Sequence, residues 1–334
     1  MGPTGSGKTS FINMASQSSL RVGSSLESCT MDIQLANPFT LDGYNITLID
    51  TPGFDDTTRS DSDILQLIAS FLSLSYEQGH ALSGIIYVHR ISDVKMGGMS
   101  RRNFSLFRKL CGDNAMKNVA IVTTRWDCVQ PDVGKSRELE LTNNEAFFKP
   151  VLDLGAKMIR HQPQTPDGTQ AILRRLIRNQ PVALQIQEEL VDRQLHLSQT
   201  MAGAELGKEQ LEQVERHRKV MAELEEEIRQ TELTDIQTKA ELEMERQILE
   251  DTIRRVETDR ARMSSGYVAQ NQVYKAKLAE MRRAPNEINE GVGRGGPGHG
   301  LYFKIALLVC CLLAVKYDRE ELESLFPILG SILR

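Results

Sequence analysis

The most constraining feature of this chain is a glycine-rich stretch near its start, Gly2–Thr9, which reads GPTGSGKT. It fits the pattern G-x-x-x-x-G-K-[ST], in which glycines permit tight turns and backbone amides cradle phosphate oxygens. Lys8 brings a positive charge to the β- and γ-phosphates, and Thr9 offers a hydroxyl to Mg²⁺ at the start of a helix. We therefore expect a phosphate-binding loop. Its predicted nucleotide contacts are Gly2, Gly5, Ser6, Gly7, Lys8, Thr9 and Ser10.

A loop of this kind normally follows a buried β-strand, but here it begins at residue 2. Either that strand lies upstream of Met1, or the chain folds without it, which would leave open sheet edges and an unfilled core. Apolar strands then alternate with amphipathic helices, including expected helices at 151–160 and 169–179. This alternation predicts an α/β fold, a doubly wound and mostly parallel sheet over residues 1–180. Ligands bind such sheets outside the carboxyl ends of the strands.

A second phosphate element, Asp50-Thr51-Pro52-Gly53, follows a short strand. A strand-end aspartate can orient Mg²⁺ through a water, and the amide of Gly53 can touch a γ-phosphate. The segment after Gly53 should therefore order with a triphosphate and relax without it. Thr30, at the end of a Gly/Ser-rich loop, is the candidate for a second Mg²⁺ hydroxyl, with an ordinary strand-start threonine as the alternative. The expected metal contacts are Thr9, Thr30 and Asp50, and the expected catalytic groups are Lys8, Thr30 and Gly53.

Base recognition is expected at Thr124-Arg125-Trp126-Asp127, directly after an apolar strand. A carboxylate at Asp127 can accept hydrogen bonds from N1–H and N2–H₂ of guanine, and adenine lacks that pair of donors. Arg125 can lie over the base, whereas we expect Trp126 to pack within the protein. A chance TRWD at a strand end is the alternative. The final guanine-contacting loop is not recognisable, and Arg160-His161 is either that loop or ordinary surface.

The three motifs GPTGSGKT, DTPG and TRWD, in this order, resemble the TRAFAC class of P-loop GTPases. The likeness is closer to septin-like and immunity-associated (GIMAP/Toc-type) G domains, particularly fungal ones with helical tails. It covers about residues 1–180 and implies binding of GTP or GDP with Mg²⁺, often with nucleotide-dependent homodimerisation and membrane attachment. Phe54 stands where Ras-like enzymes carry a water-orienting glutamine, so the resemblance implies slow hydrolysis.

The leading hypothesis is a GTP-binding switch or assembly module with slow Mg²⁺-dependent hydrolysis, whose site is completed by a partner G domain. One alternative is a non-enzymatic coiled-coil scaffold whose head binds nucleotide poorly. Another is an ATPase or nucleotide kinase with the same phosphate loop, which Asp127 disfavours. The net charge of −5 gives no basic field that would indicate nucleic acid.

Beyond residue 182 the composition changes, because glycine and proline become rare and charged residues dominate. Apolar residues recur at heptad spacing from Val214 to Met263, with one interruption at Asp235, but the matching second seam is poor. The pattern predicts a long helix over 182–285 that either pairs as a weak coiled coil or folds on itself.

Residues 286–300 read as a glycine-rich linker, and residues 301–334 form a hydrophobic tail. The apolar run within the tail is about half the length that a bilayer span needs. The tail is expected either to associate with a membrane surface or to pack locally. An odd number of cysteines and the lack of a secretory signal favour a cytoplasmic protein.

Overall fold

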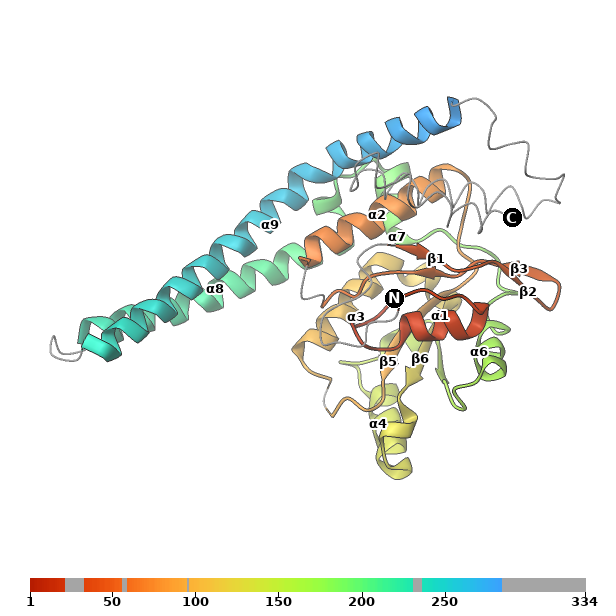
Figure 1. Ribbon diagram of the computed structural model, residues 1–334, viewed down its shortest axis with the longest axis horizontal. Helices are drawn as coiled ribbons and strands as arrows, with labels where there is room; N and C mark the ends of the chain where they lie inside the picture. Colours follow the sequence, from red (N-terminus) through yellow and green to blue (C-terminus); the bar gives the residue numbers. More distant parts are fainter. Residues whose placement is uncertain (22–32, 56–58, 95, 231–235, 284–334) are drawn as a thin grey trace.

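A computed structural model describes residues 1–21, 33–55, 59–94, 96–230 and 236–283 (Figure 1). Thr30, the linker at 286–300 and the hydrophobic tail at 301–334 lie outside these residues, so the expectations placed on them stay predictions. None of the described helices is long and apolar enough to cross a bilayer.

The centre of the fold is a parallel sheet with the strand order β5-β6-β7. Its strands are β5 (Ile85–Arg90), β6 (Val119–Thr124) and β7 (Lys157–Arg160). β6 pairs with a strand on each side and every one of its residues is buried, which is why it reads as a run of apolar and β-branched residues. The prediction of a parallel sheet wrapped by helices is confirmed.

The described residues also form two short antiparallel strand pairs. β1 (Gln34–Leu35) pairs with β4 (Ile49–Asp50), and β2 (Phe39–Leu41) pairs with β3 (Tyr44–Ile46). The turn between β2 and β3 is Asp42-Gly43, where φ is 50° and 82°. Positive φ at both central residues suits a tight hairpin, and Asp-Gly is a preferred sequence for it.

The first residue of the chain lies in the sheet, beside β5. The Met1 amine donates to the carbonyl of Ile86 at 2.8 Å, and the amide of Val88 donates to the Met1 carbonyl at 2.9 Å. This is the bonding pattern of a parallel strand pair. Burial, followed by the nearby charge of Lys8, lowers the pKa of the Met1 amine to about 5.

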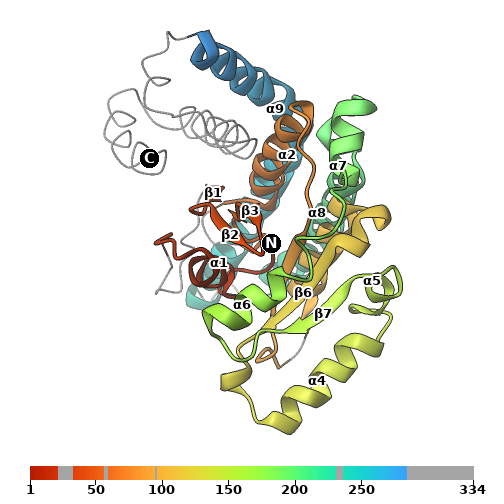
Figure 2. The ribbon, with the colours of Figure 1, turned by 90° about the vertical axis from the view of Figure 1, so that its right-hand side faces the viewer.

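Side chains of β6 alternate between two hydrophobic clusters, one on each face of the sheet. Val119 and Ile121 belong to the larger cluster, and Ala120 and Val122 to the smaller one. Helices therefore cover both faces, which is the doubly wound arrangement (Figure 2). The larger cluster includes residues of α2 (Asp61–Glu77) and α3 (Gly98–Cys111), and the smaller includes residues of α1 (Lys8–Ser16) and α6 (Pro166–Leu173).

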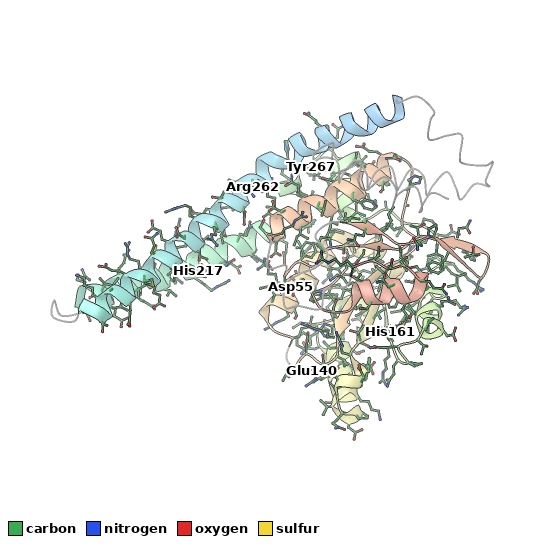
Figure 3. The ribbon with its side chains drawn as sticks, in the orientation of Figure 1. Asp55, Glu140, His161, His217, Arg262 and Tyr267 are labelled. Carbon is green, nitrogen blue, oxygen red and sulfur yellow. The ribbon has the colours of Figure 1, made fainter. Side chains whose placement is uncertain are left out.

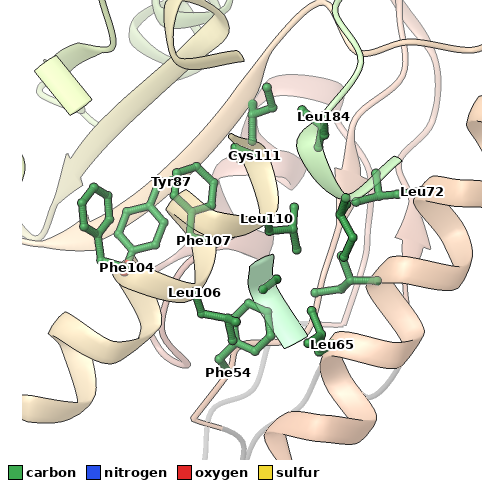
Figure 4. Packing of buried hydrophobic residues seen from close by; sticks show 14 of the residues in the cluster. Phe54, Leu65, Leu72, Tyr87, Phe104, Leu106, Phe107, Leu110, Cys111 and Leu184 are labelled. Atoms are coloured by element: carbon green, nitrogen blue, oxygen red, sulfur yellow. The ribbon is translucent and has the colours of Figure 1, made fainter. Parts of the chain in front are cut away.

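An aromatic group fills the larger cluster between β5 and α3 (Figure 4). The Tyr87 ring lies 4.8 Å from that of Phe107, and the Phe104 ring lies 4.6 Å from that of Phe148. Burial raises the pKa of the Tyr87 hydroxyl. Phe54, at the start of the expected second switch, packs in the same cluster and is only 4% exposed.

The expected helix at 151–160 is wrong, because this segment holds a short helix and then a strand. α5 (Lys149–Asp153) ends before Gly155, where φ is 100°. Such a φ breaks a helix and suits glycine. The chain then pairs in parallel with β6 as β7, so tertiary pairing overrides a pattern that looked helical. The helix before it is α4 (Pro131–Asn143).

After residue 182 the structure describes two long helices, rather than the single one expected over 182–285. A short helix, α7 (Gln185–Gln187), and two single turns lead into α8 (Met201–Gln230), and α9 (Ile236–Arg283) follows. α8 and α9 lie side by side in a hairpin that projects from the α/β part (Figure 1). Arg218 of α8 pairs with Glu257 of α9 at 2.7 Å. The long segment thus folds back on itself.

The base of the hairpin rests on the first turn of α2. Gln210 of α8 donates to Ser62 at 3.0 Å, and Arg262 of α9 lies 3.7 Å from Asp63. Farther along α2, the hydroxyls of Ser73 and Tyr267 lie 3.0 Å apart (Figure 3). The helical arm is therefore docked on the helix that follows the expected second switch.

A carboxyl group lies within this interface. Glu209 of α8 pairs at 2.9 Å with Arg102 of α3, which also pairs with Asp61. Burial is the main cause that raises the pKa of Glu209 to about 7. Arg102 and Arg216 oppose the rise, while Glu205 and Glu212 add to it.

The raised pKa of Glu209 predicts a pH-dependent stability. Its ordinary value is 4.5, so the folded state binds more protons than the unfolded state between pH 4.5 and 7. The contribution of Glu209 to the free energy of unfolding is therefore full below that range, and it is lost as pH rises through it. We expect the thermal midpoint to fall more for the wild type than for Glu209→Gln between about pH 5 and about pH 8. Glu215→Gln, exposed on the same helix, is the control, and parallel profiles for the wild type and Glu209→Gln would contradict the prediction.

Candidate functional site

The glycine loop lies between Met1 and α1, and the side chain of Lys8 bonds back to its first residues. Gly5 and Gly7 have φ of 71° and 96°, values that side chains rarely adopt. The Lys8 ammonium donates to the carbonyls of Gly2 and Pro3 at 2.9 and 2.8 Å. The loop therefore arches over the start of α1, and its amides gather near the positive end of a helix.

A threonine at the start of α1 and an aspartate at the end of β4 meet beside this loop. The Thr9 hydroxyl donates to Asp50 Oδ2 at 2.6 Å, and both side chains are buried. The other oxygen of Asp50 accepts from the amide of Thr51 at 3.1 Å. The first and second predicted phosphate elements are thus in direct contact.

The backbone after β4 presses against the glycine loop. A Cβ at Gly53 would lie 2.7 Å from the amide nitrogen and the hydroxyl oxygen of Thr4. The amide of Thr4 donates to Asp55 Oδ1 at 2.5 Å. Gly53 is therefore required here for close approach rather than for an unusual φ.

The end of β6 ties the glycine loop to the second half of the site. The Thr124 hydroxyl lies 2.8 Å from the Ser6 carbonyl and 3.3 Å from the carbonyl of His89. All three residues are buried. His89 packs its ring against Phe148, and burial lowers its pKa to about 4.

The four residues of the TRWD segment separate into buried and exposed groups. Arg125 adopts a left-handed conformation, with φ of 59° and ψ of 36°, which turns the chain sharply at the strand end. Trp126 is buried and its indole N–H lies 3.0 Å from Thr123 Oγ1. Asp127 and Arg125 are exposed. The carboxylate of Asp127 is therefore accessible at the same sheet edge as the glycine loop.

Arg160 and His161 lie next to this segment, at the end of β7. The amide of His161 donates to the Thr123 carbonyl at 2.9 Å, and its buried ring lies 5.2 Å from Phe11 (Figure 3). Burial lowers the pKa of His161. Its ring nitrogen lies 2.9 Å from the Thr169 hydroxyl, so His161 packs in the fold. Arg160 pairs with Glu138, and this hydrogen bond raises the pKa of Arg160.

Sequence reasoning missed two contacts near the loop. Asp55 accepts from Thr4, and Arg90 at the end of β5 lies 3.3 Å from the position that a Cβ on Gly5 would take. An acidic residue shortly after DTPG and a basic residue at a strand end were the available signals. The structure brings together the predicted residues of the loop, β4 and β6, whereas Ser10 is exposed on α1 and Thr30 is not described.

The residues present fit a phosphate group with Mg²⁺. Three buried hydroxyls around the loop have no hydrogen-bond partner among the described residues: Thr4, Ser6 and Thr51. Within the same described part, no group of three or more His, Cys, Asp and Glu could hold a metal alone. Mg²⁺ usually takes one or two protein oxygens together with phosphate and water. Thr9 and Asp50 supply such oxygens.

A helix-wrapped parallel sheet, a glycine-lysine loop at its carboxyl edge and an aspartate loop after β6 together define a P-loop G domain. The comparison with known families agrees. Residues 1–172, just over half of the 334, match the AIG1 family, and this protein belongs to that family.

A curated relative, "GTP-binding protein A" of Dictyostelium discoideum, is 31% identical over 138 residues. The match covers 40% of this chain, and the chain spans only 28% of that relative's length.

Among solved structures, the chain is similar to Toc33 of Arabidopsis thaliana in complex with GDP and Mg²⁺, at 18% identity and a TM-score of 0.43. That match covers 55% of this chain and 84% of Toc33. Translation elongation factor SelB of Methanococcus maripaludis, with the GTP analogue GPPNHP, gives 16% identity and a TM-score of 0.36 over 55% of this chain and 34% of SelB. Likenesses this loose transfer no residue role.

The contact between Gly53 and Thr4 predicts the effect of a single methyl group. Gly53→Ala should displace the glycine loop and lower the free energy of unfolding by about 1–3 kcal/mol, the usual cost of overpacking. Gly98→Ala, where no atom lies within 4 Å, is the control and should be neutral or slightly stabilising. Urea denaturation of the three proteins measures this. Equal stability of Gly53→Ala and the wild type would contradict the close contact.

Proposed function

We propose that this protein binds GTP and GDP with Mg²⁺ and hydrolyses GTP slowly, acting as a nucleotide switch or assembly module. The observation that carries the proposal is the hydrogen bond between Thr124 and the Ser6 carbonyl at 2.8 Å. It joins the loop suited to phosphates and the segment suited to guanine at one edge of the sheet. A nucleotide that reaches from one to the other would use both.

Each group has a role that its position supports. The amides of the glycine loop surround the β-phosphate, and Lys8 neutralises phosphate charge. Thr9 and Asp50 would hold Mg²⁺, which supplies charge neutralisation when bound. Gly53 packs against the loop at Thr4, and its amide would donate to a γ-phosphate. Asp127 accepts from N1–H and N2–H₂ of guanine, while Thr124 holds the two loops together.

Slow hydrolysis follows from the residue after Gly53. Phe54 has no group that could orient water, and it is buried between α2 and α3 (Figure 4). Phosphoryl transfer depends on a positioned nucleophile and on neutralised charge. We therefore propose that the missing positioning group comes from the G domain of a second copy, which would make hydrolysis depend on dimerisation.

Nucleotide binding is tested with a fluorescent GTP and Mg²⁺, displaced separately by GTP and ATP. We expect displacement by GTP and little by ATP, because ATP leaves Asp127 without its donor pair. Lys8→Ala should abolish binding of both. No binding by the wild type would contradict the proposal and favour a scaffold role for the helical hairpin.

The role of Asp127 predicts an exchange of preference. Asp127→Asn should weaken GTP and favour xanthosine triphosphate, because the amide can donate to the oxygen that replaces the 2-amino group of guanine. We expect a shift of about 100-fold or more in the ratio of the two affinities, since the mismatched base would cover the side chain and leave its hydrogen-bonding groups unpaired. Asp132→Asn, an exposed carboxylate on α4, is the control. Unchanged preference in Asp127→Asn would favour an ATPase or kinase.

The dimer proposal predicts that the turnover rate per molecule depends on concentration. GTP hydrolysis per molecule should rise as the protein concentration passes the dimer dissociation constant measured by sedimentation. Since Phe54 has no group that could orient water, a strictly monomeric sample should remain slow. Equal rates per molecule across that range would show that one copy carries a complete site.

A further inference from the structure

The single tryptophan of the chain is clamped inside the base-recognition segment. Its indole N–H points to Thr123, lying 3.2 Å from the carbonyl and 3.0 Å from the hydroxyl. Gly134 of α4 lies so near the ring that a Cβ there would be 2.8 Å from Trp126 Cζ3. Thr123 therefore holds the indole nitrogen, and the backbone at Gly134 packs against one edge of the ring.

Arg160 covers the Trp126 ring. The central guanidinium carbon lies 4.3 Å from the ring centroid, within the range of a cation–π contact. Glu138 of α4 orients this guanidinium through two contacts, Nε to Oε1 at 2.8 Å and Nη2 to Oε2. Gly134 and Glu138 are one helical turn apart, so the same side of α4 supports both the ring and the guanidinium.

Trp126, Arg160, Glu138 and Gly134 form a clamp. It connects separate elements at the point where the segment that carries Asp127 leaves the sheet. Arg160 is the last residue of β7 and lies opposite Thr123 in β6, while Trp126 immediately precedes Asp127. The loop begins with the left-handed turn at Arg125. Movement of Asp127 away from its position would therefore require Trp126 to leave its place under Arg160.

We propose that Arg160, oriented by Glu138, is a positioning residue that sets the guanine specificity of the site by holding Trp126 and thereby Asp127. This rests on the proposed binding of GTP. Arg160 does not need to touch the base: it acts through the tryptophan ring. The chemical feature that it selects is the N1–H and N2–H₂ donor pair of a guanine nucleotide.

A role in specificity accounts for the geometry better than a role in folding alone. The Arg160 and Glu138 side chains are 40% and 21% exposed, and ion pairs in such positions contribute little to stability. A displaced carboxylate, however, loses its paired hydrogen bonds to guanine. The glycine loop is held by Thr124, so its proposed phosphate contacts would be kept. Loss of the clamp should therefore change base discrimination and leave the phosphate affinity intact.

The test compares Arg160→Met, Glu138→Gln and the wild type by calorimetry with GTP, ATP and inorganic tripolyphosphate, each with Mg²⁺. We expect Arg160→Met to weaken GTP binding about tenfold, in line with the loss of one cation–π contact. Affinity for tripolyphosphate should not change. Glu138→Gln should act in the same direction with a smaller effect, and it keeps the arginine if Arg160→Met fails to fold.

The response of Trp126 fluorescence to GTP gives a readout that a merely structural role would not alter. GTP should change the wild-type emission, and tripolyphosphate should not, because only the base reaches Asp127. Arg160→Met should alter the emission of the free protein and reduce its response to GTP. Arg160→Lys keeps the charge near Glu138 but not the planar stack, so it should restore the GTP preference only in part.

Arg174→Met is the matched control, since Arg174 also pairs with a carboxylate, Asp42, but lies on the α1 side, away from Trp126. It should keep the wild-type ratio of GTP to ATP affinity. If Arg160→Met also keeps that ratio while the wild type prefers GTP, the clamp is overturned and the proposed function stands. Full rescue by Arg160→Lys overturns the stacking role. No GTP binding by the wild type overturns both proposals.

Discussion

The hydrogen bond from Thr124 to the Ser6 carbonyl joins the two halves of the site, and much of the structure serves to hold its two ends in place. Thr124 is the last residue of β6, which is buried along its whole length and bonded to a strand on each side. Ser6 lies in a loop that its own lysine closes. Because the end of β6 is fixed and the glycine loop is closed by Lys8, the distance between Thr124 and Ser6 can stay constant.

The same strand also organises the core. Because its side chains alternate, one face of β6 packs with α2 and α3 and the other with α1 and α6. The glycine loop opens α1 on one side, while Phe54, after β4, packs on the other. The helical hairpin extends only the α2 and α3 side. The two faces of the sheet are therefore covered unequally. One face carries α1 and α6, and the other carries α2 and α3 with the helical hairpin on them.

Local chemistry made the candidate site largely predictable. The glycine loop, Asp50, Gly53 and Thr124 lie at a tight turn or at strand ends, and both features can be recognised in the sequence. The strand at 157–160 was not predictable, because pairing with β6 decided its conformation after Gly155 ended α5. Likewise, the position of Asp55 after DTPG indicates an acidic residue near the site, but Thr4, its partner, lies far away in the chain and could not be identified from the sequence.

The arm shows the same limit. Heptad spacing from Val214 to Met263 indicated one apolar stripe but could not say what covers it. In the structure the stripe is covered partly within the hairpin and partly by the G domain, where Met263 packs in the larger cluster. Pairing partners depend on long-range contacts, such as those between α8 and α9 and that of Arg262 with Asp63.

The Met1 amine, buried against Ile86, has a practical consequence for anyone who labels this protein. A dye or an affinity tag joined directly at that nitrogen would start beside Ile86 of β5, next to the glycine loop. Amine-reactive reagents would find the group neutral near pH 7 yet shielded. The thiol of Cys128 is exposed, but it lies beside Asp127. A label that should leave the candidate site undisturbed is better attached to the exposed surface of α8, far from the sheet edge.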